Sequence, residues 1–146
     1  MKKILSVAVL GSTGYVGLEL VKILIRHPNI QIKFLGCENS PSKDIREFDQ
    51  NIVIDTLPKL DLNNNFDPKN YDLVFLSLPH GVSHKFVKNF NRKIKIIDLS
   101  ADFRLDSEKL YSKNYNNDHA CPELLNQFIY GLPEIYKDVL NTNFDV

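Results

Sequence analysis

Three glycines, Gly11, Gly14 and Gly17, have the spacing in this sequence that most directly indicates chemistry. They follow the apolar run 7–10, which is typical of a strand covered on both faces. They precede apolar residues at helical spacing, namely Val16, Leu20, Ile23 and Leu24. A turn between a buried strand and a helix directs backbone N–H groups and the positive end of the helix dipole at one point, where a phosphate can bind. The sequence therefore predicts a nucleotide diphosphate site.

Each glycine has an expected role. Gly11 permits the tight exit from the strand, Gly14 lets a diphosphate approach the backbone, and Gly17 lets the helix pack closely on the sheet. The spacing is G-x-x-G-x-x-G, not the commoner G-x-G-x-x-G, so the glycines alone leave a purely structural turn open. Their place at the first strand-to-helix junction favours the diphosphate site. The candidate cofactor-binding residues here are Gly11, Ser12, Thr13, Gly14, Tyr15, Val16 and Gly17.

The second predicted strand, 30–35, leads into a polar loop, 36–41, where doubly wound folds bind the adenosine ribose. Glu38 could accept bonds from both ribose hydroxyls, as in NAD sites. Asn39, Ser40 and Lys43 could instead donate to the 2′-phosphate of NADP. The residues leave this choice open, and an exposed polar loop without a ligand is the ordinary alternative.

A third set of candidates lies at the end of the almost wholly apolar strand predicted at 71–79. Because the carboxyl ends of parallel strands face the ligand crevice, we expect Ser77, Leu78, Pro79 and His80 to border the cofactor. A lone histidine is more often a structural group than a base, so His80 is expected in the wall of the site and not in proton transfer.

The strand predicted at 95–99, read as buried, leads into another polar loop, 100–105. Arg104 in this loop could bind a carboxylate or a phosphate in bidentate fashion, or could pair with Asp102 or Asp98. The residues alone leave these possibilities open. Ser107 is predicted to cap a helix that runs to Tyr115.

The order of these elements predicts an α/β fold of the Rossmann type across 1–146: doubly wound, with a mostly parallel sheet and helices on both faces. Between the loops, 51–55 could be a strand and Ile45 could begin a short helix. A short helix is predicted at 134–140, and a further strand is predicted to begin at Phe144.

Composition excludes several classes of protein. Lysine plus arginine equals aspartate plus glutamate, 18 of each, which argues against nucleic acid as the main partner. Cys37, placed in the ribose loop, and Cys121 give neither a disulfide framework nor a metal spacing, so we expect two free thiols. No run approaches the roughly 20 apolar residues of a membrane span, and the first strand begins too early for a signal peptide. A cytoplasmic protein without a membrane partner is expected.

Four motifs occur in order: Gly-Ser-Thr-Gly-Tyr-Val-Gly at 11–17, Leu-Pro-His-Gly at 78–81, Leu-Ser-Ala-Asp-Phe-Arg at 99–104 and Tyr-Gly-Leu-Pro-Glu at 130–134. Together they resemble the N-acetyl-gamma-glutamyl-phosphate reductase family, over nearly the whole chain. The first motif is shared with the wider semialdehyde dehydrogenase superfamily, whereas the second and third are more selective for this family.

The resemblance implies a function in arginine biosynthesis. The family reduces N-acetyl-gamma-glutamyl phosphate to the semialdehyde with NADPH: a cysteine thiolate displaces phosphate to give a thioester, and hydride then releases the aldehyde. It also implies that the loop 100–104 lies near the acyl-phosphate pocket, with Ser100 and Arg104 as substrate contacts. The expected partner is this small-molecule substrate, and the full-length protein is expected to be a homo-oligomer.

Two departures from the family pattern qualify this expectation. The family's nucleophile lies in an Asn-Pro-Gly-Cys-Tyr-Pro motif, after a strand similar to the one beginning at Phe144, so its catalytic and dimerisation domain is expected beyond residue 146. Neither Cys37 nor Cys121 has that context, and the chain alone is expected to hold no catalytic residue and to be inactive. Asn39 stands where many relatives carry arginine, which weakens the preference for NADP without reversing it.

Two other interpretations of the sequence remain open. The chain could be the nucleotide domain of an aspartate-semialdehyde dehydrogenase, which shares the glycine motif, or a stand-alone NAD(P)-binding module without chemistry. The Pro79-His80-Gly81 and Asp102-Phe103-Arg104 runs argue against the first of these.

Overall fold

The computed structural model describes residues 3–90 and 93–135. The chain forms two compact units, the first made of Met1–Leu78 and Phe90–Leu99 and the second of Pro79–Asn89 and Ser100–Val146. The strand predicted from Phe144 and all but the first two residues of the helix predicted at 134–140 lie outside the described residues. Among the described residues, no helix is long and apolar enough to cross a membrane.

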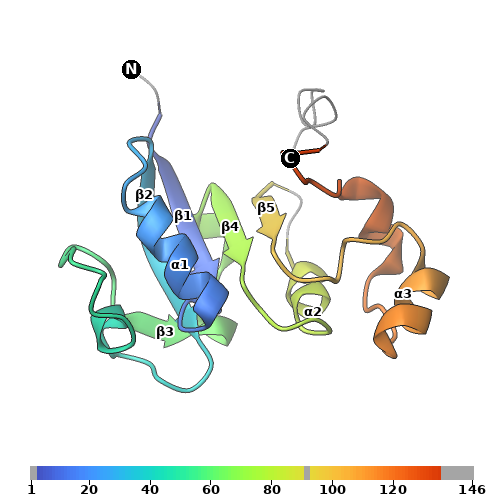
Figure 1. Ribbon diagram of the computed structural model, residues 1–146, viewed down its shortest axis with the longest axis horizontal. Coiled ribbons are helices and arrows are strands. Elements are labelled where there is room, and N and C mark those ends of the chain that lie inside the picture. Colours follow the sequence, from blue (N-terminus) through green and yellow to red (C-terminus); the bar gives the residue numbers. More distant parts are fainter. Residues whose placement is uncertain (1–2, 91–92, 136–146) are drawn as a thin grey trace. The chain divides into compact units, whose positions relative to one another are not determined.

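The first unit is a parallel sheet of five strands (Figure 1). The strands are β1 (Leu5–Leu10), β2 (Ile30–Cys37), β3 (Leu60–Leu62), β4 (Leu73–Leu76) and β5 (Lys95–Asp98), in the spatial order β3-β2-β1-β4-β5. Every pair of neighbouring strands is parallel. This order is that of a Rossmann-type sheet, so the predicted fold class is confirmed. Because the order reverses at β1, the carboxyl ends of β1 and β4 form the topological switch point, where such folds bind ligands.

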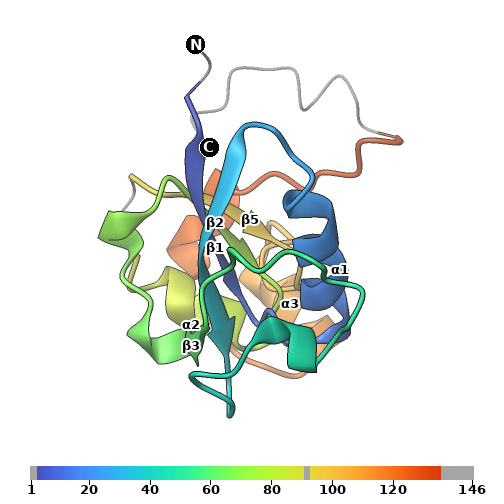
Figure 2. The same cartoon turned by 90° about the vertical axis from the view of Figure 1, so that its left-hand side faces the viewer.

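Helix α1 (Tyr15–Leu24) lies along one face of this sheet, as both views show (Figures 1 and 2). Its buried residues are Gly17, Val21 and Leu24, and the last two pack in one core with Val7 and Val9 of β1. Of the apolar residues at helical spacing, Val16 and Ile23 do not belong to this core, because their side chains are 56% and 66% exposed. The helix is turned so that the smallest residue, Gly17, faces the end of the strand.

The segment between β2 and β3 differs from the prediction. The 3₁₀ helix η1 (Ile45–Glu47) confirms a helix that begins at Ile45. The strand predicted at 51–55 is absent: the Asp49 carboxylate accepts the Asn51 N–H at 2.9 Å, which makes a local turn in place of strand pairing. The third strand of the sheet is instead Leu60–Leu62, which the sequence pattern did not indicate.

Strand β5 is also less buried than predicted. Ile97 and the following Leu99 are 40% and 42% exposed. In the described part of the chain β5 pairs with β4 alone, so it forms an edge of the sheet. The apolar residues Ile96, Ile97 and Leu99 are therefore not a sign of a buried strand here.

The second unit contains α2 (Ser83–Val87), α3 (Glu108–Tyr115) and the 3₁₀ helix η4 (Pro122–Gln127). Ser107 caps α3, since its side chain accepts the Leu110 N–H at 3.4 Å, and this prediction is confirmed. The helix ends at Asn116, whose φ of 52° is the left-handed conformation common at helix C-termini.

A buried carboxylate, Asp102, organises the second unit. It accepts hydrogen bonds from the Gly81 N–H at 2.7 Å, the His84 N–H at 3.1 Å and the Tyr111 hydroxyl at 2.8 Å. Burial and this carboxylate raise the pKa of Tyr111, which therefore remains a hydrogen-bond donor. The bonds fix Gly81 in its left-handed conformation, with φ of 80°, and cap the first turn of α2. Asp102 thus holds the loop that carries His80.

A second buried group, His119, packs against this centre. Its Nε2 lies 2.9 Å from the Asp102 carbonyl oxygen and its Nδ1 accepts the Cys121 N–H at 3.3 Å. Since a carbonyl oxygen can only accept, Nε2 carries the proton and the ring is neutral. Burial lowers the pKa of His119 below its ordinary 6.5, and the neighbouring His84 lowers it further.

Asp102→Asn should lower the free energy of unfolding by about 1–3 kcal/mol, because the new amide nitrogen would face a backbone N–H and leave a buried donor without an acceptor. Chemical denaturation would measure the loss. Tyr111→Phe is the matched comparison: it removes one donor and keeps the ring, and should cost less. Equal stability of Asp102→Asn and the unchanged chain would contradict the role given to this carboxylate.

Acidification should destabilise the chain through His119. Because the folded pKa lies below the unfolded value, stability is complete above pH 6.5 and is lost as the pH falls below it, when the unfolded state binds the extra proton. One such group contributes a slope of at most about 1.4 kcal/mol per pH unit. Unfolding free energies measured from pH 7.5 to 5 should show a shallower slope in His119→Gln. Equal slopes in His119→Gln and in the unchanged chain would refute the assignment.

Candidate nucleotide-binding site

The glycine turn between β1 and α1 is built by close backbone contacts. Gly11 has a φ of 74°, and a Cβ there would lie 2.4 Å from the carbonyl oxygen of Ser77. A Cβ at Gly17 would lie 2.3 Å from the carbonyl oxygen of Gly11 and 2.7 Å from the Cα of Ser12. Gly11 therefore permits the tight exit as predicted. The close approach at Gly17, however, is to the turn itself, and not to the sheet as the sequence had indicated.

Residues from β2 and from the segment after β3 hold this turn. The Ser12 N–H and hydroxyl both donate to the Gly36 carbonyl oxygen, at 2.8 and 2.9 Å. The Gly11 N–H donates to Oδ1 of Asn63 at 3.0 Å. Ser12 therefore uses its own donors within the protein. Sequence reasoning did not find Gly36 and Asn63, because a run of three asparagines at 63–65 indicates only a turn.

The N-terminus of α1 keeps donors for a ligand. Gly14 precedes the helix without a side-chain cap, and the first intrahelical acceptor bond runs from the Leu18 N–H to the Gly14 oxygen at 2.9 Å. The N–H groups of Tyr15, Val16 and Gly17 therefore have no acceptor within the helix. A Cβ at Gly14 would touch only the Gly11 oxygen, at 3.6 Å, so the space beside Gly14 is open. Free donors beside open space at a helix N-terminus can bind a phosphate.

The end of β4 lies against the same turn. The Ser77 N–H donates to the Leu10 oxygen at 2.9 Å, and a Leu78 methyl lies 3.1 Å from where a Gly11 Cβ would be. The structure thus brings Ser77 and Leu78 beside the glycines. The Ser77 hydroxyl is buried and has no hydrogen-bond partner among the described residues. An unpartnered buried hydroxyl at a switch point fits a polar ligand.

The predicted ribose loop begins later than expected. Strand β2 continues through Cys37, which is buried and donates its thiol hydrogen to the Asp61 carbonyl at 3.2 Å. The placement of Cys37 in the loop is therefore wrong. Glu38 and Asn39 are exposed and Ser40 is half-buried. The far end of the loop is tied to β3, because the Ser42 N–H donates to the Leu60 oxygen at 2.7 Å.

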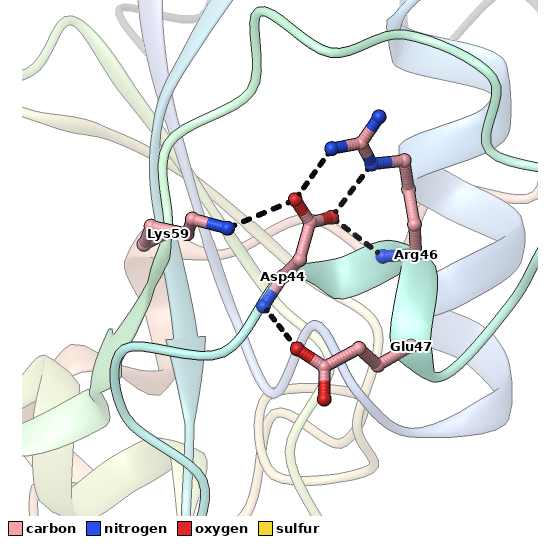
Figure 3. Close-up of polar contacts among 4 residues, drawn as sticks. All are labelled: Asp44, Arg46, Glu47 and Lys59. Atoms are coloured by element: carbon pink, nitrogen blue, oxygen red, sulfur yellow. Dashed lines mark hydrogen bonds and ion pairs between the residues drawn. The ribbon is translucent and has the colours of Figure 1, made fainter.

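A charged cluster follows this loop (Figure 3). The Asp44 carboxylate accepts from Arg46 Nε and Nη2 at 2.9 and 2.7 Å and from Lys59 Nζ at 3.1 Å, while Glu47 accepts the Asp44 N–H at 3.0 Å. The bonds from Arg46, with that from Lys59, hold the pKa of Asp44 well below its usual range. Two of the cations near the loop are therefore already paired. The Lys43 ammonium lies 5.9 Å from the centre of the Phe48 ring.

The remaining candidates belong to the second unit. Pro79 and His80 are exposed, and the His80 ring lies 5.9 Å from that of Tyr115. The guanidinium of Arg104 is exposed, contacts the Ser100 carbonyl at 3.5 Å and lies 5.7 Å from the Tyr130 ring centre. The alternative that Arg104 pairs with Asp102 is wrong, because Asp102 is buried among its three other donors.

Neither cysteine of the chain has the surroundings of a nucleophile. Cys37 and Cys121 are both free and buried, as the sequence predicted for two thiols without a disulfide. Burial raises the pKa of Cys121 to about 11, which disfavours the thiolate. Among the described residues, no group of histidine, cysteine, aspartate or glutamate side chains could hold a metal ion.

Comparison with known proteins agrees with this geometry. The family described as "Semialdehyde dehydrogenase, NAD binding domain" matches residues 6–143. The N-acetyl-gamma-glutamyl-phosphate reductase of Ehrlichia chaffeensis is 41% identical over 95% of this chain and 40% of its own length. The enzyme of that name from Paracoccus denitrificans is 42% identical over 92% of this chain and 39% of its own length. The resemblance found in the motifs is thereby confirmed, and the chain spans about two fifths of the length of these relatives.

Solved structures support the fold. The crystal structure of an aspartate semialdehyde dehydrogenase with NADP from Candida albicans has a TM-score of 0.58 and 23% identity, covering 73% of this chain and 32% of that one. An aspartate semialdehyde dehydrogenase II from Vibrio cholerae gives the same TM-score at 20% identity. The glycine turn, the parallel sheet and the matched family model lead to one conclusion: the chain belongs to the semialdehyde dehydrogenase NAD-binding domain family.

Proposed function

We propose that residues 1–146 are the NADP-binding part of a cytoplasmic oxidoreductase of arginine biosynthesis. The reaction proposed is the reduction of N-acetyl-gamma-glutamyl phosphate to N-acetyl-glutamate semialdehyde, with release of phosphate. The relatives of that name are 41% and 42% identical to this chain, which favours this substrate over aspartate semialdehyde. The complete protein is proposed to act on this small molecule as a homo-oligomer.

The N-terminus of α1 is the observation that carries the nucleotide-binding proposal. The N–H groups of Tyr15, Val16 and Gly17 would bind the diphosphate, and Gly14 leaves room for it. Thr13 and the half-buried Ser77 would line the same crevice. Ser12 would act through the turn, since its donors are already used. Bound there, the cofactor would supply the hydride of the reduction.

The choice of NADP over NAD rests on the loop after β2. Asn39 and Ser40 would donate to the 2′-phosphate, while the exposed Glu38 beside them would favour an unphosphorylated ribose. Arg46 and Lys59 are held by Asp44, so they are not the donors expected for this phosphate. The preference for NADP would therefore come from the small neutral donors Asn39 and Ser40.

The second unit would contact the substrate. The Arg104 guanidinium is exposed and could bind a carboxylate or the acyl phosphate in bidentate fashion, with Ser100 beside it. Pro79 and His80 would border the nicotinamide. The thiolate that attacks the acyl phosphate would come from outside these residues, because both cysteines here are buried.

The purified chain should bind NADPH more tightly than NADH, as measured by isothermal titration calorimetry. It should show no phosphate-dependent reduction of NADP with N-acetyl-glutamate semialdehyde, because it offers no accessible thiolate. The complete gene product should be assayed in parallel with this substrate and with aspartate semialdehyde. Turnover by the 146-residue chain, or a preference of the complete product for aspartate semialdehyde, would overturn the proposal.

Gly14→Val should weaken NADPH binding at least tenfold, because its side chain would fill the open space through which the diphosphate approaches the backbone. The folded chain should tolerate the change, since Gly14 has a φ of −76° that any residue adopts. Gly14→Ala should have a smaller effect on affinity. Gly17→Ala is the contrasting variant: its Cβ meets backbone at 2.3 Å, so it should lower the melting temperature. Unchanged NADPH affinity in Gly14→Val would place the diphosphate elsewhere.

A further inference from the structure

We propose that Asn63 is a positioning residue for nucleotide binding: its side-chain oxygen holds the Gly11 N–H and thereby fixes the turn whose following N–H groups receive the diphosphate. For its ligand the proposal rests on the proposed function. It assigns a role to a residue that belongs to none of the sequence motifs.

The contact joins two distant parts of the first unit. Asn63 begins the 3₁₀ helix η2 (Asn63–Asn65), directly after β3, and its Oδ1 lies 3.0 Å from the Gly11 nitrogen. A backbone N–H requires an acceptor, so the oxygen of the side-chain amide must face Gly11 and the amide nitrogen must point away. The side chain therefore has one orientation that satisfies this bond.

Strand β2 leaves room for this side chain. A Cβ at Gly36 would lie 2.3 Å from the Asn63 Oδ1, closer than atoms can approach, and 3.2 Å from both Leu10 Cα and a carbon of the Phe34 ring. An alanine at Gly36 would therefore push Asn63 away from Gly11. The carbonyl of the same Gly36 accepts both donors of Ser12. Gly36 thus leaves room for the bond between Asn63 and Gly11, and its carbonyl accepts both hydrogen bonds from Ser12.

The effect on binding follows from the position of Gly11. Its φ of 74° directs the chain from β1 into the turn, and the bond to Asn63 acts on this residue. Without the bond the Gly11 N–H would turn to water, and the turn would adopt further conformations. Ligand binding would then have to restore order to the turn, which lowers affinity.

The experiment compares two asparagines of η2 in the 146-residue chain. Asn63→Ala should weaken NADPH binding roughly three- to tenfold, the worth of one hydrogen bond. Asn64→Ala, at an exposed neighbouring position, should leave it unchanged. Adenosine 2′-monophosphate has no 5′-phosphate to meet the turn, so its affinity should be equal in both variants and the unchanged chain. An equal loss for both ligands would indicate a merely structural role and overturn the proposal.

A double-mutant cycle tests the contact without any ligand. Gly36→Ala should lower the unfolding midpoint in the unchanged chain, and should lower it less in the Asn63→Ala background, because the clash is then removed. If the two substitutions change the unfolding midpoint additively, the role proposed for Asn63 is overturned, whereas the proposed function is not affected. Failure of the unchanged chain to bind NADPH would instead overturn the proposed function, and this proposal with it, while the cycle would still report on the contact.

Discussion

The contact of Gly17 with the carbonyl of Gly11 is the constraint on which the ligand-binding end of the first unit depends. Both partners are backbone, so neither can rotate aside, and an added Cβ would lie 2.3 Å from the oxygen. This contact brings the first turn of α1 beside the last residue of β1. A helix displaced by a larger residue would carry its unpaired N–H groups away from the switch point. The placement of these N–H groups and the packing of α1 are therefore consequences of the same small residue.

A bulge in β2 brings the second strand to this turn. Val7 pairs with Ile32 and Ala8 pairs with Phe34, so Lys33 is an extra residue in the strand. Past the bulge the inward alternation changes: Ile32 lies in the core beside α1, and after it Leu35 and Cys37 do so. Phe34 packs instead against Phe66 and Tyr71. The bulge thus sets the register in which the Gly36 carbonyl reaches Ser12, and it explains why this strand alternates only at its start.

The sequence predicts those features of the fold that depend on local backbone demands. The glycine turn, the Ser107 cap and the mostly parallel sheet follow from positive φ, capping chemistry and apolar runs. What the sequence did not show was decided by tertiary packing. Val16 and Ile23 have helical spacing, but the contact at Gly17 turns them outward. Ile96, Ile97 and Leu99 are apolar, yet β5 is an edge strand among the described residues. Asn63 could not be found, since its acceptor role exists only once β3 lies beside β2.

Neighbouring residues of one motif have opposite roles in the second unit. Asp102 is fully buried and its carboxylate is compensated by two backbone N–H groups and a phenol, without an arginine. Arg104, two residues later, is consequently not neutralised by Asp102, and its guanidinium lies over Tyr130 in contact with solvent. An exposed guanidinium beside an internally bonded acid fits the substrate contact proposed for this loop. Despite their close spacing, Asp102 therefore supports the fold while Arg104 remains accessible, and the two do not form an ion pair.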